Sequence, residues 1–183
     1  LEWHAHVDFA QKRLTCTATL RFHQPPTNTT PLDLDARQLF ISKVTDLDGH
    51  LLTWEALPTD PILGTPLRII VPPLTAGVRL EYRTASDASA LQWLEPSMTH
   101  GGKQPFLFSQ CQAIHARSLV PCQDTPGHRI TYAAMLEVPA PLVAVMAAAP
   151  GKRSEHAGLR AFSFDMPQPI PPYLLAFAVG DLG

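Results

Sequence analysis

The chain has 183 residues, 45% of them hydrophobic, so it is long enough to bury one core and too apolar to be disordered throughout. Its 14 Lys and Arg residues against 16 Asp and Glu residues give a formal net charge of -2. This balance argues against nucleic acid and anionic membranes as partners, because both need a basic excess. No apolar run approaches the roughly 20 residues of a membrane helix.

Cysteine and proline usage narrows the class of protein further. The 3 cysteines are an odd number and do not suggest a disulfide framework, so we expect a reducing compartment, the cytoplasm. The 19 prolines are about twice the average share, and proline ends helices. We therefore expect no long helices.

Two strictly alternating segments open the chain, and we predict that they pair as a β-hairpin. Apolar residues occupy every second position over residues 1–9 and again over 14–22, with a polar turn between. This period of two is that of a strand with one buried face. Shorter apolar runs predict further strands at 32–34, 39–44 and 51–54, the last two separated by a turn at Asp48–Gly49.

The middle of the chain predicts a second hairpin and then a long irregular region. Residues 67–71 and 78–82 alternate on either side of Pro72–Pro73, and we predict that they pair with each other. Residues 83–129 are less periodic and rich in polar residues, Pro and Gly. We expect this region to form long ordered loops, which often hold function.

The last third of the chain predicts more strands. Apolar alternation or apolar runs occur at 130–138, 142–149, 159–164 and 173–179, the last with the pattern of a fully buried strand. About ten short strands with few helix signals predict an all-β fold, either a sandwich or an open pair of curved sheets.

The sequence does not contain a complete set of ligands for a catalytic zinc ion. The H-E-x-x-H motif of zinc hydrolases does not occur. His4 and His6 share one face of the first predicted strand and could hold a metal together. That face also carries Glu2 and Asp8, and we interpret it as an ordinary solvated face. We therefore expect no metal ligands and no cofactor in this chain.

Two further groupings offer reactive residue types without a recognisable pattern. Cys111, His115 and Cys122 match no compact zinc spacing, and we interpret the cysteines as buried, inert thiols. Ser109, His115 and Asp124 are the residue types of a hydrolytic triad, but no G-x-S-x-G motif surrounds the serine. We expect no catalytic residue among them.

A pair of glutamines is the most informative feature of the irregular region. Gln110 and Gln112 would point the same way if the backbone is extended, and would present two amide groups to one small volume. Such a pair suits the binding of an ammonium group or a peptide. It equally suits a structural role that ties the loop to its neighbours, so both interpretations stay open on the residues alone.

Four segments carry a resemblance to a known family: LQWL at Leu91–Leu94, PFLFSQCQAIHAR at Pro105–Arg117, PCQDTP at Pro121–Pro126 and PYLLAFAVG at Pro172–Gly180. They resemble the N-terminal domain of bacterial zinc aminopeptidases of the leukotriene hydrolase and aminopeptidase N family, which are gluzincin metallopeptidases. The opening hairpin and Leu32–Asp35 are similar too, so the resemblance spans essentially the whole chain.

The resemblance implies a saddle-shaped, mostly antiparallel β domain that covers one side of a separate, thermolysin-like catalytic domain. In that family the catalytic domain supplies the H-E-x-x-H zinc motif and a G-x-M-E-N strand that binds peptide. We therefore expect residues 1–183 to be a single N-terminal domain of a longer enzyme that removes N-terminal residues from peptides. The missing initiator Met agrees with this. The zinc would belong to the rest of the enzyme, and this chain alone would be inactive.

The resemblance also implies substrate-binding roles for three residues. Gln112 would reach into the active site and help hold the free α-ammonium of the substrate, Gln110 would lie beside the first side-chain pocket, and Ala113 would help line it. A neutral amide oxygen can accept a hydrogen bond from the ammonium without adding a second buried charge. We also expect an unusual peptide bond, such as a cis bond, between Gln112 and Ala113.

The partners follow from the same resemblance. We expect the enzyme's own catalytic domain and peptide substrates, and we expect self-association through the face that a missing catalytic domain leaves uncovered. The alternative is a stand-alone β domain that binds peptides or protein partners without catalysis. If the H-E-x-x-H and G-x-M-E-N motifs occur in the residues after 183, the chain is part of an aminopeptidase. If they do not, the stand-alone binding domain is the better hypothesis. Epoxide hydrolysis does not follow from the resemblance.

Overall fold

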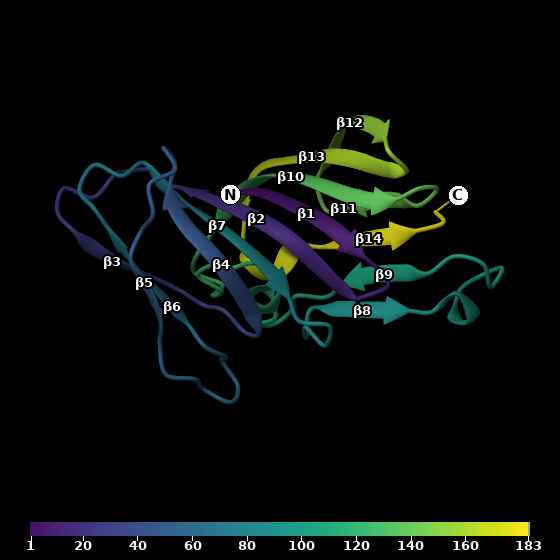
Figure 1. The fold of residues 1–183 in the computed structure, drawn as a ribbon, viewed down its shortest axis with the longest axis horizontal. Coiled ribbons are helices and arrows are strands. Elements are labelled where there is room, and N and C mark those ends of the chain that lie inside the picture. The colour runs from purple at the N-terminus through teal and green to yellow at the C-terminus, as the bar shows by residue number, and fades with distance from the viewer. Residues whose placement is uncertain (183) are drawn as a thin grey trace.

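The computed structural model describes residues 1–182, and these form three β-sheets (Figure 1). The seven-stranded sheet has the order β12 (Ala149–His156), β13 (Leu159–Ile170), β10 (Ile130–Pro139), β1 (Glu2–Asp8), β2 (Arg13–Arg21), β7 (Gly77–Thr84) and β4 (Leu39–Asp46). The four-stranded sheet has the order β11 (Val143–Met146), β14 (Phe177–Gly180), β9 (Phe106–Ser109) and β8 (Leu91–Leu94). The three-stranded sheet has the order β3 (Thr30–Leu34), β6 (Leu67–Val71) and β5 (Trp54–Ala56).

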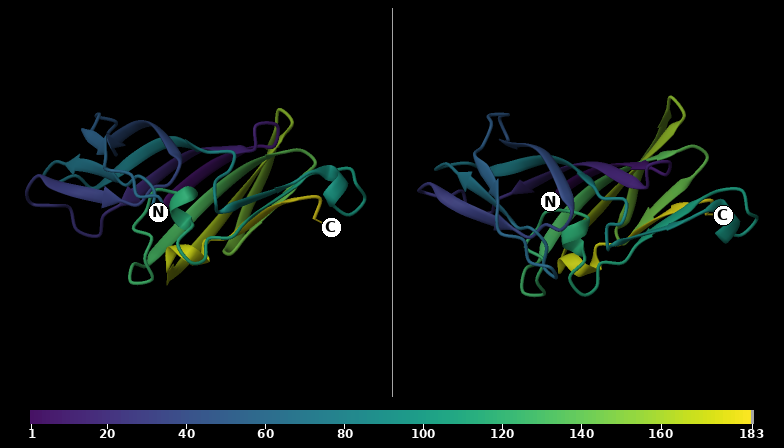
Figure 2. Two further views of the ribbon diagram at one scale, coloured as in Figure 1. Left: turned by 90° about the horizontal axis from the view of Figure 1, so that it is seen from below. Right: turned by 60° about the horizontal axis from the view of Figure 1, so that its bottom comes forward.

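Helical structure is confined to short 3-10 turns in the described residues: η1 (Pro96–Met98), η2 (Ala116–Ser118) and η3 (Pro172–Leu174). None of the helices found over residues 1–182 has the length and hydropathy needed to span a membrane. The prediction of an all-β fold is confirmed, and the sheets have the open, curved form of a saddle (Figure 2).

The core lies between the large sheet and the two smaller ones. Trp3, Ala5 and Val7 of β1 are buried, and they alternate with polar residues on the opposite face. The Trp3 ring packs against Phe177 of β14, with the ring centroids 5.8 Å apart. Ile69 of β6 belongs to the same buried cluster, so all three sheets share one core.

The opening hairpin is confirmed, because β1 pairs antiparallel with β2 from Glu2↔Thr19 to Asp8↔Arg13. On its other side β1 pairs parallel with β10, over Glu2↔Ala133 to His6↔Glu137. The first strand of the chain therefore lies in the middle of the large sheet.

The predicted second hairpin is wrong. β6 pairs with β3 and β5 in the small sheet, whereas β7 pairs with β2 and β4 in the large sheet. Pro72 and Pro73 have no N–H to donate to a ladder, and Leu74 has a φ of +63°, so the chain leaves one sheet before it enters the other. The turn near Asp48–Gly49 exists, but in the described residues its two sides form an isolated bridge, Thr45↔Leu51, and not a ladder of paired strands.

Three other expectations need correction. The region 83–129 is not all loop, because β8 and β9 lie within it. The run at 173–179 is not a fully buried strand, because it begins within η3, Leu174 is 47% exposed, and the strand starts only at Phe177. Strand β12 was missed because all eight of its residues are exposed, so it has no apolar alternation to detect.

Candidate functional site

The residues from Gln110 to His115 form a turn that follows β9. Gln110 N donates to Ala90 O at 2.8 Å, and His115 N donates to Cys111 O at 2.9 Å, so both ends of the turn are tied to backbone. The backbone is not extended at Gln112, and the two glutamines do not form the parallel pair considered from the sequence. Instead Gln112 N donates to Gln110 Oε1 at 3.1 Å.

The three residues implied in substrate binding differ in how they are engaged. The side chains of Gln110, Gln112 and Ala113 are all exposed. The side-chain amide oxygen of Gln110 is committed to the turn, whereas the side-chain carboxamide of Gln112 makes no hydrogen bond within residues 1–182. The peptide bond between Gln112 and Ala113 is cis, as expected. The turn therefore presents one uncommitted carboxamide at the surface.

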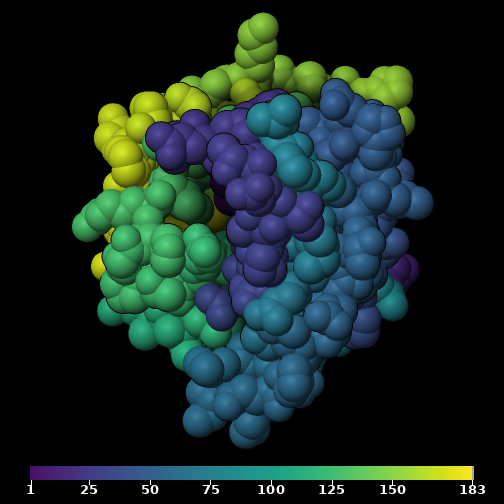
Figure 3. Space-filling view, turned by 90° about the vertical axis from the view of Figure 1, so that its left-hand side faces the viewer, coloured from purple at the N-terminus to yellow at the C-terminus, as the bar shows by residue number. Residues whose placement is uncertain are grey.

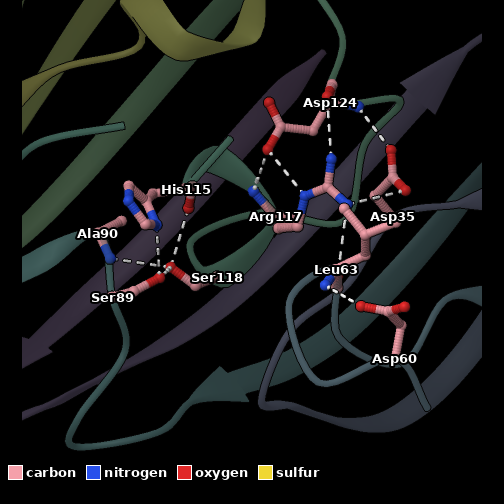
Figure 4. A network of polar contacts seen from close by, with 9 residues as sticks. All are labelled: Asp35, Asp60, Leu63, Ser89, Ala90, His115, Arg117, Ser118 and Asp124. Carbon is pink, nitrogen blue, oxygen red and sulfur yellow. Dashed lines mark hydrogen bonds and ion pairs between the residues drawn. The ribbon is translucent and has the colours of Figure 1, made fainter. Parts of the chain in front are cut away.

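A buried cation fixes the segment that follows the turn (Figure 4). The side chain of Arg117 is only 4% exposed, and its Nε donates to Asp124 Oδ2 at 3.1 Å. Its Nη2 donates to Asp124 O at 3.0 Å, while Nη1 donates to Asp35 Oδ1 and Leu63 O, each at 3.3 Å. Asp124 N in turn donates to Asp35 Oδ2 at 2.9 Å. One guanidinium thus joins three segments that are distant in sequence.

A second set of contacts holds the turn from its other side. Ser118 Oγ donates to His115 O at 2.8 Å and accepts a hydrogen bond from Ala90 N at 2.9 Å. His115 Nδ1 lies 2.9 Å from Ser89 Oγ. These contacts and the Arg117 network appear side by side in Figure 4, with η2 between them.

The large sheet reaches the same segment through a relay of hydrogen bonds. Trp3 Nε1 donates to the Tyr82 hydroxyl at 2.9 Å, and that hydroxyl donates to Leu119 O at 3.0 Å. Both side chains are buried, and burial raises the pKa of Tyr82 well above its usual value. The hydroxyl therefore stays protonated and keeps its role as a donor.

The loop that supplies Leu63 depends on a glycine beside the network. Gly64 has a φ of +91°, a backbone conformation that favours glycine. A Cβ at Gly64 would lie 2.5 Å from Ala36 O, which is backbone and cannot move aside cheaply. This close approach brings the loop within hydrogen-bond distance of Arg117.

The possible hydrolytic triad and the cysteine grouping noted in the sequence form no reactive site, because their side chains either contact other residues or are buried thiols. Phe177 N donates to Ser109 Oγ at 2.9 Å, Asp124 pairs with Arg117, and His115 faces Ser89, so the described residues show no hydrolytic triad. Burial raises the pKa of Cys111 to about 12, and burial raises that of Cys122 well above its usual value. The interpretation of these cysteines as buried thiols is confirmed.

The hollow on the surface shown in Figure 3 is separate from the turn that carries Gln110, Gln112 and Ala113. It has a volume of about 810 Å³ and lies between the start of the β2–β3 connection, at Phe22–Gln24, and residues His128–Ala133. None of the three turn residues lines it.

Sequence reasoning missed the residues that hold the turn in place. Arg117 was noted only within a resembling segment, and Asp124 only within another such segment and as a triad candidate. A buried arginine has no sequence signature of its own, because arginine is normally exposed. The chemical types of Arg117, Asp124 and Asp35 were visible, but their proximity depends on the fold.

The fold and this turn define an all-β domain that presents a polar group on an anchored loop. Residues 1–174 match the family model of the Peptidase M1 N-terminal domain, and the chain belongs to this family. It is 39% identical over 185 residues to leukotriene A-4 hydrolase of Xenopus laevis, covering 97% of this chain and 30% of that protein. It is also 39% identical over 181 residues to leucine aminopeptidase 2 of Yarrowia lipolytica, covering 96% and 27%.

Solved structures agree with this assignment. Native leukotriene A4 hydrolase from Saccharomyces cerevisiae superimposes with a TM-score of 0.84 at 32% identity, over 100% of this chain and 28% of that chain. An M1 zinc metallopeptidase from Deinococcus radiodurans, bound to a Tyr-Ser-Ala substrate, gives a TM-score of 0.74 at 20% identity, over 98% and 41%, and supports the fold alone. The chain spans less than a third of the length of the two curated relatives.

Proposed function

We propose that this chain is the N-terminal domain of a cytoplasmic zinc aminopeptidase, and that it helps to recognise the α-ammonium of peptide substrates. The observation that carries the proposal is the Gln112 carboxamide, which is exposed and uncommitted on a turn whose flanks are held by buried contacts. Because the backbone of the turn is anchored, less entropy is lost when Gln112 binds a ligand than would be lost on a mobile loop. The buried thiols fit a reducing compartment.

Two turn residues would have supporting roles. The Gln110 side chain holds the backbone N–H of Gln112, so it would fix the direction in which Gln112 points. Ala113 adds a small exposed side chain beside it and would leave room for the first substrate side chain. Zinc would activate the attacking water, and its ligands would come from the rest of the enzyme because this sequence has no H-E-x-x-H motif.

The outer face of the four-stranded sheet supports the presence of a partner domain. Val145, Ala178 and Phe108 are direct partners across β11, β14 and β9, so their side chains share one face. Val145 is 46% exposed and Phe108 is 36% exposed. The residues next to them, Val179 and Leu107, are buried in the core. We propose that the catalytic domain covers this apolar row, and that the chain alone self-associates through it.

The first test concerns the parent enzyme. The G-x-M-E-N and H-E-x-x-H motifs should follow residue 183 in its reading frame. Their absence would leave the stand-alone binding domain as the better hypothesis.

The second test is Gln112→Ala in the full-length parent, assayed with a free dipeptide and with its N-acetylated form. A hydrogen bond to a charged group contributes about 1.5–3 kcal/mol, so kcat/KM for the free dipeptide should fall roughly ten- to a hundredfold. The acetylated peptide should change little, because it carries no ammonium. Gln11→Ala, at an exposed glutamine in the β1–β2 turn, is the matched control and should leave kcat/KM unchanged.

A purely structural role for Gln112 has a different signature. The variant would then lose thermal stability and active fraction, while kcat/KM per titrated active site would equal that of the wild type. That result would overturn the recognition role.

A further inference from the structure

Two histidines and one glutamate meet on the outer face of the large sheet. His4 and His6 lie on β1, and the parallel pairing of β1 with β10 places Glu137 directly opposite His6. His4 Nε2 lies 3.6 Å and His6 Nδ1 lies 3.7 Å from the same atom, Glu137 Oε2. The buried residues Trp3, Ala5 and Val7 alternate with the two histidines, so both imidazoles face away from the core.

The possible metal-ligand atoms of this cluster contact one another without forming hydrogen bonds. None of the three side chains makes a hydrogen bond within the described part of the chain, and Glu137 forms no ion pair there with Lys or Arg. Their side chains are 49%, 41% and 33% exposed, in the order His4, His6, Glu137. They line a hollow of about 580 Å³ on the sheet surface, together with Thr15 and Thr17 of β2. An ion and its waters can therefore reach them.

We propose that His4, His6 and Glu137 form a binding site for a divalent first-row transition metal such as Zn²⁺. Imidazole nitrogen and carboxylate oxygen are ordinary ligands of these metals. Two ligands in a tetrahedral zinc site lie about 3.4 Å apart, given bond lengths near 2.1 Å. Both histidine–carboxylate distances are close to that spacing. Water completes the coordination shell.

The site binds metal weakly. The two imidazoles approach the carboxylate separately, and the three groups do not form a closed ligand set before the ion arrives. Their exposed side chains must rotate to close it, and this ordering costs free energy. We expect an affinity in the micromolar range. This inference revises the expectation of no metal ligands. That expectation was drawn from the sequence, which does not show that Glu137 lies beside the first strand of the chain.

A second cluster on the chain serves as a contrast. Asp46, Asp48 and His50 bring their ligand atoms within 4.8 Å of one another, a closer grouping than that of His4, His6 and Glu137, whose two imidazoles lie farther apart. Asp46 Oδ1 already accepts hydrogen bonds from the backbone N–H groups of Asp48 and His50, and Asp46 Oδ2 lies 2.9 Å from His50 Nδ1. These contacts close a turn, and they give the cluster a structural role without a metal.

The test is calorimetric titration of the 183-residue chain with Zn²⁺, combined with NMR of the histidine ring protons. One ion should bind per chain, and the ring signals of His4 and His6 should shift before those of the other histidines. His4→Gln, His6→Gln and Glu137→Gln should each weaken binding about tenfold or more. His50→Gln is the matched control and should bind Zn²⁺ like the wild type.

The proposal fails in either of two outcomes. Wild-type chain that shows a cooperative unfolding transition but no zinc heat at millimolar Zn²⁺ would exclude the site. Binding that survives the double substitution of His4 and His6 but is lost in His50→Gln would move the site to the Asp46 turn. Neither outcome bears on the aminopeptidase proposal, since the cluster and Gln112 are tested with separate variants.

Discussion

Arg117 Nε lies 3.1 Å from Asp124 Oδ2, and the two side chains are 4% and 1% exposed, so this ion pair is almost completely removed from water. A buried pair contributes little net stability compared with an apolar pair of the same shape, but it enforces its own geometry, because either charge alone is costly to bury. Here the enforced geometry joins the segment after Gln112 to the end of β3 and to the loop at Leu63.

Replacing Arg117 by Met should therefore cost far more than a surface arginine does. Asp124 would keep its buried charge without a partner, and we expect a loss of about 3–5 kcal/mol in the free energy of unfolding. Urea denaturation measures this. Arg68→Met is the control, since the Arg68–Asp33 pair lies at the surface and should contribute far less. Equal losses in the two variants would contradict the structural role of Arg117.

The three thiols should be unreactive while the chain is folded. Burial raises the pKa of Cys16 and of Cys111 to about 12, and it also raises that of Cys122, so the thiolate that attacks a disulfide reagent is scarce near pH 8. Titration with a coloured aromatic disulfide should detect no fast-reacting thiol in native protein and all three in denaturant. A fast-reacting thiol in native protein would show that its site opens to solvent.

Stability should depend on pH through the Asp46–His50 pair. The hydrogen bond to Asp46 raises the pKa of His50, and the same bond lowers the pKa of Asp46. The contribution of His50 is therefore present at low pH and lost as the pH rises through its raised pKa. That of Asp46 is present at high pH and lost as the pH falls through its lowered pKa.

The Asp46–His50 pair should therefore stabilise the fold most at pH values between the lowered pKa of Asp46 and the raised pKa of His50. We expect His50→Gln to reduce the free energy of unfolding at about pH 5.5 and to have a smaller effect at about pH 8.5. Matched urea titrations of wild type and variant at both pH values measure the difference. A larger effect at the higher pH would show that the sign is wrong.

Self-association should depend on the apolar row of the four-stranded sheet. Removing apolar area from a dimer interface weakens it, and we expect Phe108→Gln to raise the dimer dissociation constant about tenfold. Sedimentation at several concentrations measures this. Met98→Gln is the control, because Met98 is 65% exposed on the β8–β9 connection and lies outside the row. A wild-type chain that stays monomeric would count against an uncovered interface.

The isolated chain should hydrolyse no aminoacyl-nitroanilide and should retain no zinc after dialysis against a chelator. It lacks the H-E-x-x-H ligands and general base, and the weak site on the sheet face would release its ion under the same conditions. Release assays and metal analysis measure both. Zinc held at nanomolar affinity would contradict the expectation.

Alternation with a period of two predicted the strands that bury one face. Ala5 and Val7 of β1, and Leu136 of β10, could be assigned to the core from their spacing. Pairing could not be assigned in the same way, because the sequences of β6 and β7 are equally compatible with each other and with other strands. The error at Pro72–Pro73 arose from assuming that neighbours in sequence are neighbours in a sheet.

The residues alone drew attention to Gln110 and Gln112, but only the resemblance favoured a binding role over a structural one. Gln112 was singled out, and its cis bond to Ala113 is present, but the extended glutamine pair is not. The hydrogen bond from Gln112 N to Gln110 Oε1 is a property of the turn, and turns of this kind have no periodic signal. The substrate contacts of these residues stay predictions.

The placement of β1 between β2 and β10 has a consequence for biosynthesis. A nascent chain can assemble β1 with β2, and later with β7 and β4, while one edge of β1 remains open. Its parallel partner emerges from the ribosome only when Ile130–Pro139 has been made. Pairing across so long a separation is entropically slow and leaves an unpaired edge available to other chains. Chaperone binding to the growing chain should therefore be strongest before β10 appears.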